Sequence, residues 1–358
     1  RQYHRFTADR HLLEVVGHGR ALNATVSRPD LLLMACLLHD IGKGQPGDHT
    51  EIGTELTKVI TARMGFDTRD SHVLTQLVRH HLLVSDTATR RDLDDPATVR
   101  NVASAVGDEL TLELLEALSQ ADGLGTGTTA WGSWKAGLVR ELCERVRSAL
   151  HGHDVVIEER DYADVIDDAR AKGVVVRRDG DWLAVAAPDQ PGLLATITAV
   201  LTLANINIRS ADLMSTHDVA IDRFLCVPGP RGWPELERLE SEIREGLRGG
   251  RDFPTLISQR AQNYRTRPAS AHASPTTATF IINASDRASV LELRTRDSLG
   301  LLAQVTRFFA ELGIDVAAAR LSTVGDMAVD TFYLTRHSQP LTADAEQDTA
   351  RRLATLLP

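Results

Sequence analysis

One stretch of this 358-residue chain occurs twice, and the repeat constrains the fold more than any other feature. The segment Asp189-Gln190-Pro191-Gly192-Leu193-Leu194 returns 108 positions later as Asp297-Ser298-Leu299-Gly300-Leu301-Leu302. The same shift aligns later residues, including Ile206 with Ile314, Leu213 with Leu321, Asp222 with Asp330, and Phe224 with Phe332. A constant shift across a turn, a helix and two strands indicates two copies of one structural unit.

Each copy reads as strand, Asp-x-x-Gly turn, helix, strand, hairpin turn, strand and helix. This order is typical of a ferredoxin-like βαββαβ sandwich, an α+β fold with helices on one face of an antiparallel sheet. We expect the last strand of the first copy at Thr279–Asn283, and no final strand is apparent for the second. Two β-type runs open this half, Val174–Arg177 and Trp182–Ala187, separated by the turn signal Asp179-Gly180-Asp181. Residues 265–278 have the composition of an exposed linker.

The first 150 residues show helical spacing of apolar side chains throughout. An apolar run at Asp30–Asp40 follows the start signals Ser27 and Pro29 and closes at Gly42. Further helices are expected at Thr50–Met64, Ser71–Val84, Asp95–Val106, Thr111–Ala121 and Trp134–Leu150. The chain is therefore predicted to be multidomain, with an all-α domain at 1–155, a connector at 156–181 and two α+β domains at 182–283 and 284–358.

Composition excludes several classes of protein. The sequence has no run of 18 apolar residues and no charged-then-apolar leader, so it predicts neither a membrane span nor a secretory signal. The net charge of −9 argues against broad binding of nucleic acids or anionic membranes. Cys36, Cys143 and Cys226 are far apart in apolar surroundings, which favours buried, reduced thiols and a cytoplasmic protein. Because the sequence begins with Arg1, we expect a piece of something longer.

A set of histidines and aspartates in the helical half points to a metal site. His39 and Asp40 end an apolar helix, where a charged group is costly unless something pairs with it, and a metal is one such partner. Imidazoles and carboxylates bind Mn²⁺, Fe²⁺, Zn²⁺ or Mg²⁺. This set contains no cysteine thiolate, which excludes a structural zinc site of the cysteine type. Consecutive helix positions point about 100° apart, so His80 and His81 reach one ion only awkwardly. The other members of the set are His11, His49 and Asp122.

The order of these motifs resembles the HD-domain phosphohydrolases, most closely the branch found in PII uridylyltransferase/uridylyl-removing enzymes. The doubled repeat looks like the tandem ACT domains that end those proteins, and the resemblance runs through residues 1–335 or so. The motifs that carry it are Tyr3-His4-Arg5-Phe6-Thr7 before His11, Leu38-His39-Asp40-Ile41-Gly42-Lys43-Gly44, Gly47-Asp48-His49, His81-Leu82-Leu83 before Arg90-Arg91-Asp92, and Ala121-Asp122 before Gly125-Thr126-Gly127 and Trp131-x-x-Trp134-Lys135.

The resemblance implies roles for individual residues. One divalent ion, with Mn²⁺ or Mg²⁺ favoured and Fe²⁺ or Zn²⁺ as alternatives, would be held by His11, His39, Asp40 and Asp122. A second ion would lie between His49, His81 and a bridging Asp40, and two cations would clamp a phosphodiester and supply a hydroxide. Lys43 would act beside Asp40 in catalysis by neutralising phosphate oxygens. Arg90 and Arg91 are candidates for binding the nucleotide phosphate.

Each Asp-x-x-Gly turn precedes a helix, whose free amides suit a carboxylate. Asp189 can cap its helix, Gly192 and Gly300 permit close approach of the backbone, and Asp189 or Asp297 can meet an amino group. Together these are the partners of an α-amino acid, and the resemblance to ACT domains implies glutamine as the regulatory ligand. Asn205 and Asn207 are further candidate contacts. The alternative is that the aspartates are only helix caps and the repeats only pack or dimerise.

Three functions are consistent with these patterns. The favoured hypothesis is a hydrolase that removes UMP or AMP from a modified tyrosine of the signal protein PII, stimulated by glutamine. The second is a guanosine tetra/pentaphosphate hydrolase, although Ile41-Gly42-Lys43 carries no acidic pair and two adjacent ACT copies fit it poorly. The third is a catalytically inert amino-acid sensor. Nucleotidyl transfer would need upstream residues, because no Gly-Ser motif followed by a paired-Asp strand is found.

Overall fold

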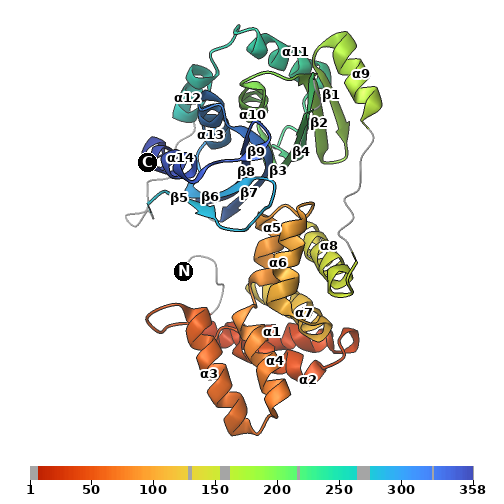
Figure 1. Ribbon diagram of the computed structural model, residues 1–358, viewed down its shortest axis with the longest axis vertical. Coiled ribbons are helices and arrows are strands. Elements are labelled where there is room, and N and C mark those ends of the chain that lie inside the picture. The colour runs from red at the N-terminus through yellow and green to blue at the C-terminus, as the bar shows by residue number, and fades with distance from the viewer. Residues whose placement is uncertain are drawn as a thin grey trace. The chain divides into compact units, whose positions relative to one another are not determined.

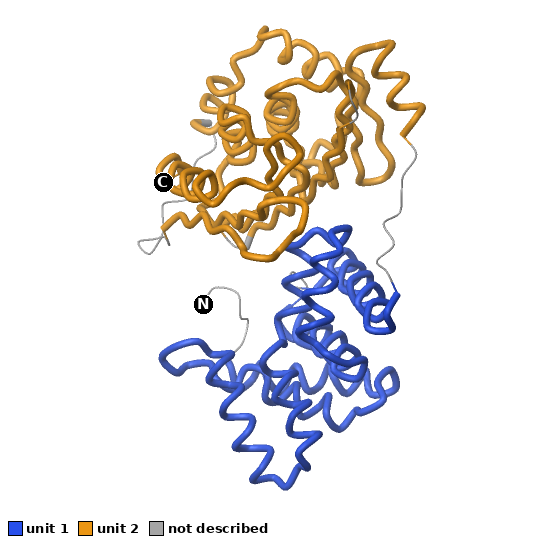
Figure 2. Tube along the Cα trace, viewed as in Figure 1, with its two compact units in different colours: residues 1–157 blue, residues 158–358 orange. Residues whose placement is uncertain are grey.

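The computed structural model describes residues 7–127, 131–153, 162–215, 218–263, 275–324 and 326–357. The chain divides into two compact units, Arg1–Ile157 and Glu158–Pro358 (Figure 2). The Tyr3-His4-Arg5-Phe6 part of the first motif and residues 265–274 of the expected linker lie outside the described residues. None of the described helices combines the length and apolarity needed to cross a membrane.

The first unit is helical, as the sequence predicts (Figure 1). Aspartates begin several of its helices: Asp48, Asp67, Asp95 and Asp108 each accept a hydrogen bond from a backbone amide of the following turn. Its elements are α1 (Ala8–Ala21), the short 3₁₀ helix η1 (Asn23–Thr25), α2 (Pro29–Leu38), α3 (His49–Met64), α4 (Thr68–Arg79), α5 (Leu83–Arg90), α6 (Pro96–Val106), α7 (Glu109–Thr126) and α8 (Ser133–Leu150).

Helix α2 lies in the core of this unit, which explains its uninterrupted apolar sequence. Leu31, Leu32, Ala35 and Cys36 are fully buried and pack in one cluster with side chains of α1, α4 and α7. The prediction of one helix over Ser71–Val84 is wrong, because the chain breaks after Arg79 and resumes helical structure at Leu83. The break changes the direction in which the intervening histidines point, and this matters for the site described below.

The second unit is one antiparallel sheet with helices packed on it (Figure 1). Its strand order is β1-β2-β4-β3-β7-β8-β6-β5, with β9 paired to β8. Its elements are α9 (Ala163–Lys172), β1 (Val175–Asp179), β2 (Trp182–Pro188), α10 (Leu193–Leu203), β3 (Ile206–Ser215), β4 (Val219–Pro228), α11 (Leu236–Leu247), α12 (Phe253–Asn263), β5 (Thr277–Ile281), β6 (Ser289–Arg296), α13 (Leu301–Glu311), β7 (Asp315–Val324), β8 (Met327–Arg336), β9 (Gln339–Pro340) and α14 (Ala343–Leu356).

The two copies of the repeat meet about a local two-fold axis. Strand β3 pairs with β7 so that Ala211 lies opposite Ala319, and these two residues occupy the same position in the two copies. The equivalent threonines of α10 and α13 also meet, with 3.0 Å between the Oγ1 atoms of Thr198 and Thr306. The repeat that the sequence shows is therefore a structural repeat, and the ferredoxin-like layering of each copy is confirmed.

The expected assignment of the edge strands is wrong. The strand near Thr279–Asn283 is β5, and it pairs with β6 of the second copy instead of closing the first. In each copy the edge strand is the first strand along the chain. It is β1 in the first copy, where it pairs with β2, and β5 in the second, where it pairs with β6. Apart from the two-residue β9, which follows β8, each copy thus reads ββαββα, and its edge strand stands at the beginning of the copy and not at its end.

Two buried acids at equivalent positions predict how the stability of this unit depends on pH. Burial, with a contribution from the charge of Asp189, raises the pKa of Asp222 to about 8. Burial raises the pKa of Asp330 to about 7, although the amide of Ser322 donates to it. The folded chain therefore keeps protons that the unfolded chain releases near pH 4, so the contribution of these two acids to stability is greatest below pH 4 and falls as pH rises toward 7 and 8.

We expect the double variant Asp222→Asn/Asp330→Asn to have a higher Tm than the parent at pH 8 and a similar Tm at pH 4. Each neutral amide removes a loss in the free energy of unfolding of up to about 1.4 kcal/mol per pH unit, over the range between the pKa of that acid in the unfolded chain and its pKa in the folded chain. Calorimetric unfolding of the full chain across this range measures the effect. Parallel Tm-against-pH curves for parent and variant would contradict it.

Candidate metal centre

The turn after α2 presents the central pair of side chains. Helix α2 ends at Leu38, so that His39 caps it and Asp40 follows, and both side chains are almost fully buried. The backbone then folds back, with the amide of Lys43 donating to the carbonyl of Asp40 at 3.0 Å. A Cβ on Gly42 would lie 2.1 Å from the carbonyl oxygen of His49. Glycine at this position therefore lets the start of α3 lie directly against the turn.

The predicted ligands come from five segments and converge on Asp40. Its Oδ2 lies 3.4 Å from His39 Nε2 and 3.7 Å from His11 Nε2, on the side where Asp122 Oδ1 is 3.0 Å from the same His11 nitrogen. Its Oδ1 lies 3.6 Å from His81 Nε2 and 3.9 Å from His49 Nε2. Two groups thus share one carboxylate, and within each group the donor atoms are within 4.8 Å of one another: His11, His39 and Asp40, and Asp40, His49 and His81.

The histidine rings are held so that one nitrogen points inward. His39 Nδ1 is 3.0 Å from the carbonyl oxygen of Cys36, and His81 Nδ1 is 2.7 Å from that of Val78. When Nδ1 donates to these carbonyls, Nε2 keeps its lone pair for a ligand, as is usual for metal-binding histidines. Of the adjacent pair at the break after α4, His81 reaches the centre, and His80 caps the helix.

The centre also contains buried polar atoms that the protein leaves unsatisfied. Within the described part of the chain, neither His39 Nε2 nor Asp40 Oδ1 has a hydrogen-bond partner, although both atoms are buried. Leaving such a group unpaired costs about 1–3 kcal/mol. A divalent cation between these atoms would satisfy both, and imidazole and carboxylate are ligands that such cations accept. The residues present therefore fit a metal ion.

The charges in the centre support the same interpretation. Burial lowers the pKa of His39, but the neighbouring carboxylates of Asp122 and Asp40 outweigh it and raise the pKa to about 9. Burial also raises the pKa values of Asp40 and Asp122, yet His39 next to both, with Lys43 beside Asp40 and His11 beside Asp122, holds them well below the usual range. The two carboxylates thus stay ionised at neutral pH and stabilise positive charge between them, here a proton on His39 that a divalent cation would have to displace in order to bind.

The basic residues predicted near the site are placed differently from one another. Lys43 contacts Asp40 Oδ2 directly, with its side chain partly open to solvent. Arg90, at the end of α5, forms an ion pair with Asp86 at 3.1 Å, and Arg91 donates to the carbonyl of Arg90. Sequence reasoning did not assign a role to Lys135, whose ammonium lies close enough for the charges of Asp122 and Arg90 to affect its pKa.

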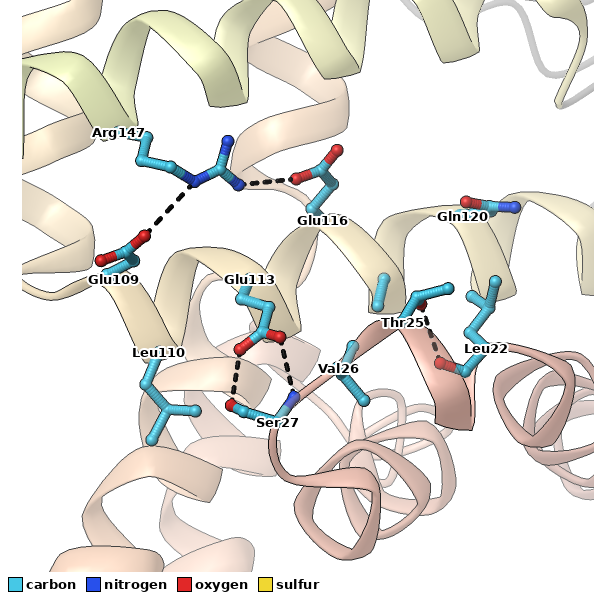
Figure 3. A pocket seen from close by; sticks show the side chains of 11 residues that line it. Leu22, Thr25, Val26, Ser27, Glu109, Leu110, Glu113, Glu116, Gln120 and Arg147 are labelled. Carbon is cyan, nitrogen blue, oxygen red and sulfur yellow. Dashed lines mark hydrogen bonds and ion pairs between the residues drawn. The ribbon is translucent and has the colours of Figure 1, made fainter.

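A cavity in this unit is a separate feature (Figure 3). It has a volume of about 710 Å³ and lies where η1 meets α7 and α8, away from the histidine and aspartate groups. Its acidic side chains are already engaged: Glu113 accepts bonds from the amide and hydroxyl of Ser27, while Glu109 and Glu116 flank Arg147 at 3.6 and 3.3 Å. These contacts link the loop before α2 to α7 and α8, a structural role.

The two Asp-x-x-Gly turns differ from expectation in one detail. The helix caps are Gly192 and Gly300, with φ of 84° and 83°, so Asp189 does not cap α10. The Asp189 carboxylate instead accepts a hydrogen bond from Ser215 of β3, and Asp297 lies 3.5 Å from the equivalent Thr323.

The other predicted ligand contacts lie elsewhere in the first copy. Asn205 and Asn207 follow the C-terminal end of α10, about 16 Å along the helix from the turn that precedes it. The two equivalent turns have neighbours of opposite charge in the other copy. Arg209 of β3 acts on Asp297, whereas Asp315 of β7 and Asp189 act on each other as like charges. The asparagines therefore belong to the end of the paired sheet where Arg209 faces Asp297.

Comparison with known proteins agrees with this architecture. Residues 8–124 match the HD domain, and residues 182–232 and 289–350 match the ACT domain. The chain carries an HD domain followed by two ACT domains. It is homologous to bifunctional uridylyltransferase/uridylyl-removing enzymes, with 36% identity to that of Streptomyces coelicolor over 98% of this chain and 48% of that protein.

The same enzyme of Mycobacterium tuberculosis is 36% identical over 93% of this chain and 43% of that protein. That of Pseudomonas putida is 27% identical over 95% of this chain and 46% of that protein. The chain thus spans about half the length of the curated relatives it matches. The HD and ACT matches indicate a hydrolase-type domain joined to a pair of regulatory domains.

Proposed function

We propose that this chain hydrolyses a nucleotidyl phosphodiester and releases UMP or AMP from the modified tyrosine of the signal protein PII. The observation that carries the reaction class is the position of Asp40, whose carboxylate belongs to both ligand groups. That arrangement suits divalent cations acting together on one phosphate. Support for the substrate is the homology to enzymes named as uridylyl-removing.

The proposed cofactor is Mn²⁺ or Mg²⁺, with Fe²⁺ and Zn²⁺ as alternatives, bound as one or two ions. When bound, such ions polarise phosphate oxygens and lower the pKa of a coordinated water. The first ion would be held by His11, His39, Asp40 and Asp122, and the second by Asp40, His49 and His81.

The remaining residues of the proposed site bind and orient. Lys43 sits at the rim in contact with Asp40, where its ammonium can neutralise negative charge that builds up on phosphate oxygens. The carbonyls of Cys36 and Val78 keep the rings of His39 and His81 in one tautomer and orientation. Arg90 and Arg91, at the end of α5, are proposed to meet the nucleotide phosphate.

A direct comparison of substrates tests this function. Purified chain loaded with Mn²⁺ is offered uridylylated PII, adenylylated PII and guanosine tetraphosphate side by side, and released nucleotide is measured. We expect release of UMP or AMP that chelation abolishes. Preferential hydrolysis of guanosine tetraphosphate would favour an alarmone hydrolase, and amino-acid binding without any hydrolysis would favour an inert sensor.

Glutamine is the proposed effector, and the charges favour a place for it. An α-amino acid carries a carboxylate and an ammonium group, so its site needs both a cation and an anion. Arg209 and Asp297 offer both across the pair of copies without forming an ion pair with each other. The Asp189 turn instead faces the carboxylate of Asp315. We therefore place glutamine at the turn of the second copy.

Asp297→Ala is expected to remove stimulation of hydrolysis by glutamine and to weaken glutamine binding by about tenfold or more, as loss of a charged partner does. The matched control is Asp189→Ala, which changes the equivalent residue of the first copy and should leave most of the response. Calorimetric titration with glutamine and activity assays give both readouts. A response lost only in the Asp189 variant would place the effector at the other turn.

A further inference from the structure

Lys135 is a partly desolvated cation that the proposed mechanism does not use. It lies in the first turn of α8, and its ammonium is 5.8 Å from the centre of the Trp131 ring. Burial lowers the pKa of Lys135, opposed by the charges of Asp86 and Asp122 and reinforced by that of Arg90. The charges of Asp86 on α5 and of Asp122 on α7, a proposed metal ligand, both act on this ammonium.

Within the described residues Lys135 forms neither a hydrogen bond nor an ion pair closer than 4 Å. Its neighbour Arg90 differs, because that guanidinium is already paired with Asp86 at 3.1 Å. A cation that is taken out of water without a partner costs free energy, and an anion brought to it would offset that cost. Of these two basic side chains, Lys135 has the greater capacity to accept an anionic ligand.

Trp131 connects this cation to the helix that carries Asp122. The Trp131 ring packs on Gly123, where a Cβ would lie only 2.5 Å from ring atom Cε3. Gly123 directly follows Asp122, whose Oδ1 is 3.0 Å from His11 Nε2. The indole is half-buried, and the amide end of α8 adds partial positive charge to the same region. Aromatic surface and positive charge are what a nucleotide requires of a protein.

We propose that Lys135 binds a non-bridging phosphate oxygen of the nucleotidyl substrate, with the Trp131 ring beside its ammonium. The inference rests on the proposed hydrolysis of a nucleotidyl phosphodiester and adds the residue that receives the phosphate. It explains why an unpaired ammonium persists next to a carboxylate-rich centre. Lys135 then contributes to binding the substrate in its ground state more than to the chemical step.

The test uses the full chain with Lys135→Met, which removes the charge but keeps an unbranched side chain, and with Lys135→Arg, which restores the charge. Lys58→Met is the matched control, since Lys58 is an exposed lysine of α3 paired with Glu55. The readouts are kcat and KM for nucleotidylated PII, the Kd for whichever of UMP and AMP the parent binds more tightly, and Tm. Nucleotide binding is measured by calorimetry in the presence of Mn²⁺.

For Lys135→Met we expect KM and Kd to rise about 10- to 100-fold, the effect of losing one charged hydrogen bond, with kcat within about threefold of the parent. Its Tm should be equal or higher, because a partly desolvated charge with no anionic partner is removed. Lys135→Arg should recover most of the binding, and Lys58→Met should match the parent. An unchanged Kd, a lowered Tm in Lys135→Met, or no nucleotide binding by the parent would overturn the inference.

The two proposals fail separately. If the parent binds nucleotide through Lys135 but leaves nucleotidylated PII intact, the proposed function is wrong and the phosphate-binding residue stands. If the parent hydrolyses nucleotidylated PII and Lys135→Met has unchanged KM and Kd, the function stands and the inference about Lys135 is wrong.

Discussion

Asp40→Asn is expected to lower phosphodiester hydrolysis by at least about 100-fold, a loss that even outer partners of metal ligands can cause. The carboxylate lies 3.4–3.9 Å from four imidazole nitrogens and takes part in both ligand groups. An amide is neutral and a weaker ligand for divalent cations. The variant should therefore lose bound metal as well as activity. Adding Mn²⁺ in moderate excess should not restore the activity.

Asp48→Asn is the matched control for this change. Asp48 belongs to the same motif region, but it is the exposed N-cap of α3 and accepts bonds from the amides of Thr50 and Glu51. Asparagine caps helices about as well as aspartate, so activity and metal content should stay near those of the parent. Elemental analysis of both variants, alongside release of nucleotide, measures the difference. Equal activity in the parent and Asp40→Asn would remove Asp40 from the site.

Gly42→Ala is expected to destabilise the helical unit by about 1–3 kcal/mol, as overpacking of a closed site does. The added Cβ would lie 2.1 Å from the carbonyl oxygen of His49 and 2.6 Å from the amide nitrogen of Gly53, and backbone atoms cannot rotate away. The start of α3 must then shift, which moves His49 away from Asp40. Activity should fall together with stability, because the second ligand group depends on that contact.

The control for Gly42→Ala is Gly17→Ala. Gly17 lies inside α1, and nothing occurs within 4 Å of the position its Cβ would take. Alanine is favoured over glycine within a helix by about 0.5–1 kcal/mol, so this variant should be slightly more stable than the parent. Thermal unfolding monitored by circular dichroism compares them. A Gly42→Ala protein as stable and as active as the parent would contradict the close packing of the turn against α3.

The metal-site motif could be predicted from sequence because its residues mark ends of helices. His39 and Asp40 follow an apolar run, and Gly42 marks the turn, so the local pattern carries the information. The break that directs His81 toward Asp40 could not be predicted in the same way. The apolar spacing continues through Leu82 and Val84, and only packing in three dimensions separates α4 from α5. Local periodicity therefore favoured one continuous helix.

The pairing of the edge strands and the role proposed for Lys135 were not predicted from the sequence, for different reasons. The sequence of β5 shows that a strand exists, but whether it pairs with the preceding or the following copy depends on contacts far along the chain. Lys135 carried a usable signal: it is one of only four lysines and ends the Trp131-x-x-Trp134-Lys135 motif. Its lack of an anionic partner, however, becomes visible only in the folded structure.

The most direct test of the central claim is anomalous scattering from crystals of the chain grown with Mn²⁺, together with elemental analysis of the same protein. We expect one or two bound ions per chain, with anomalous density between His11, His39 and Asp40 or between Asp40, His49 and His81. Protein prepared with ample Mn²⁺ that shows no anomalous density among these side chains, and no bound divalent metal by analysis, would contradict it.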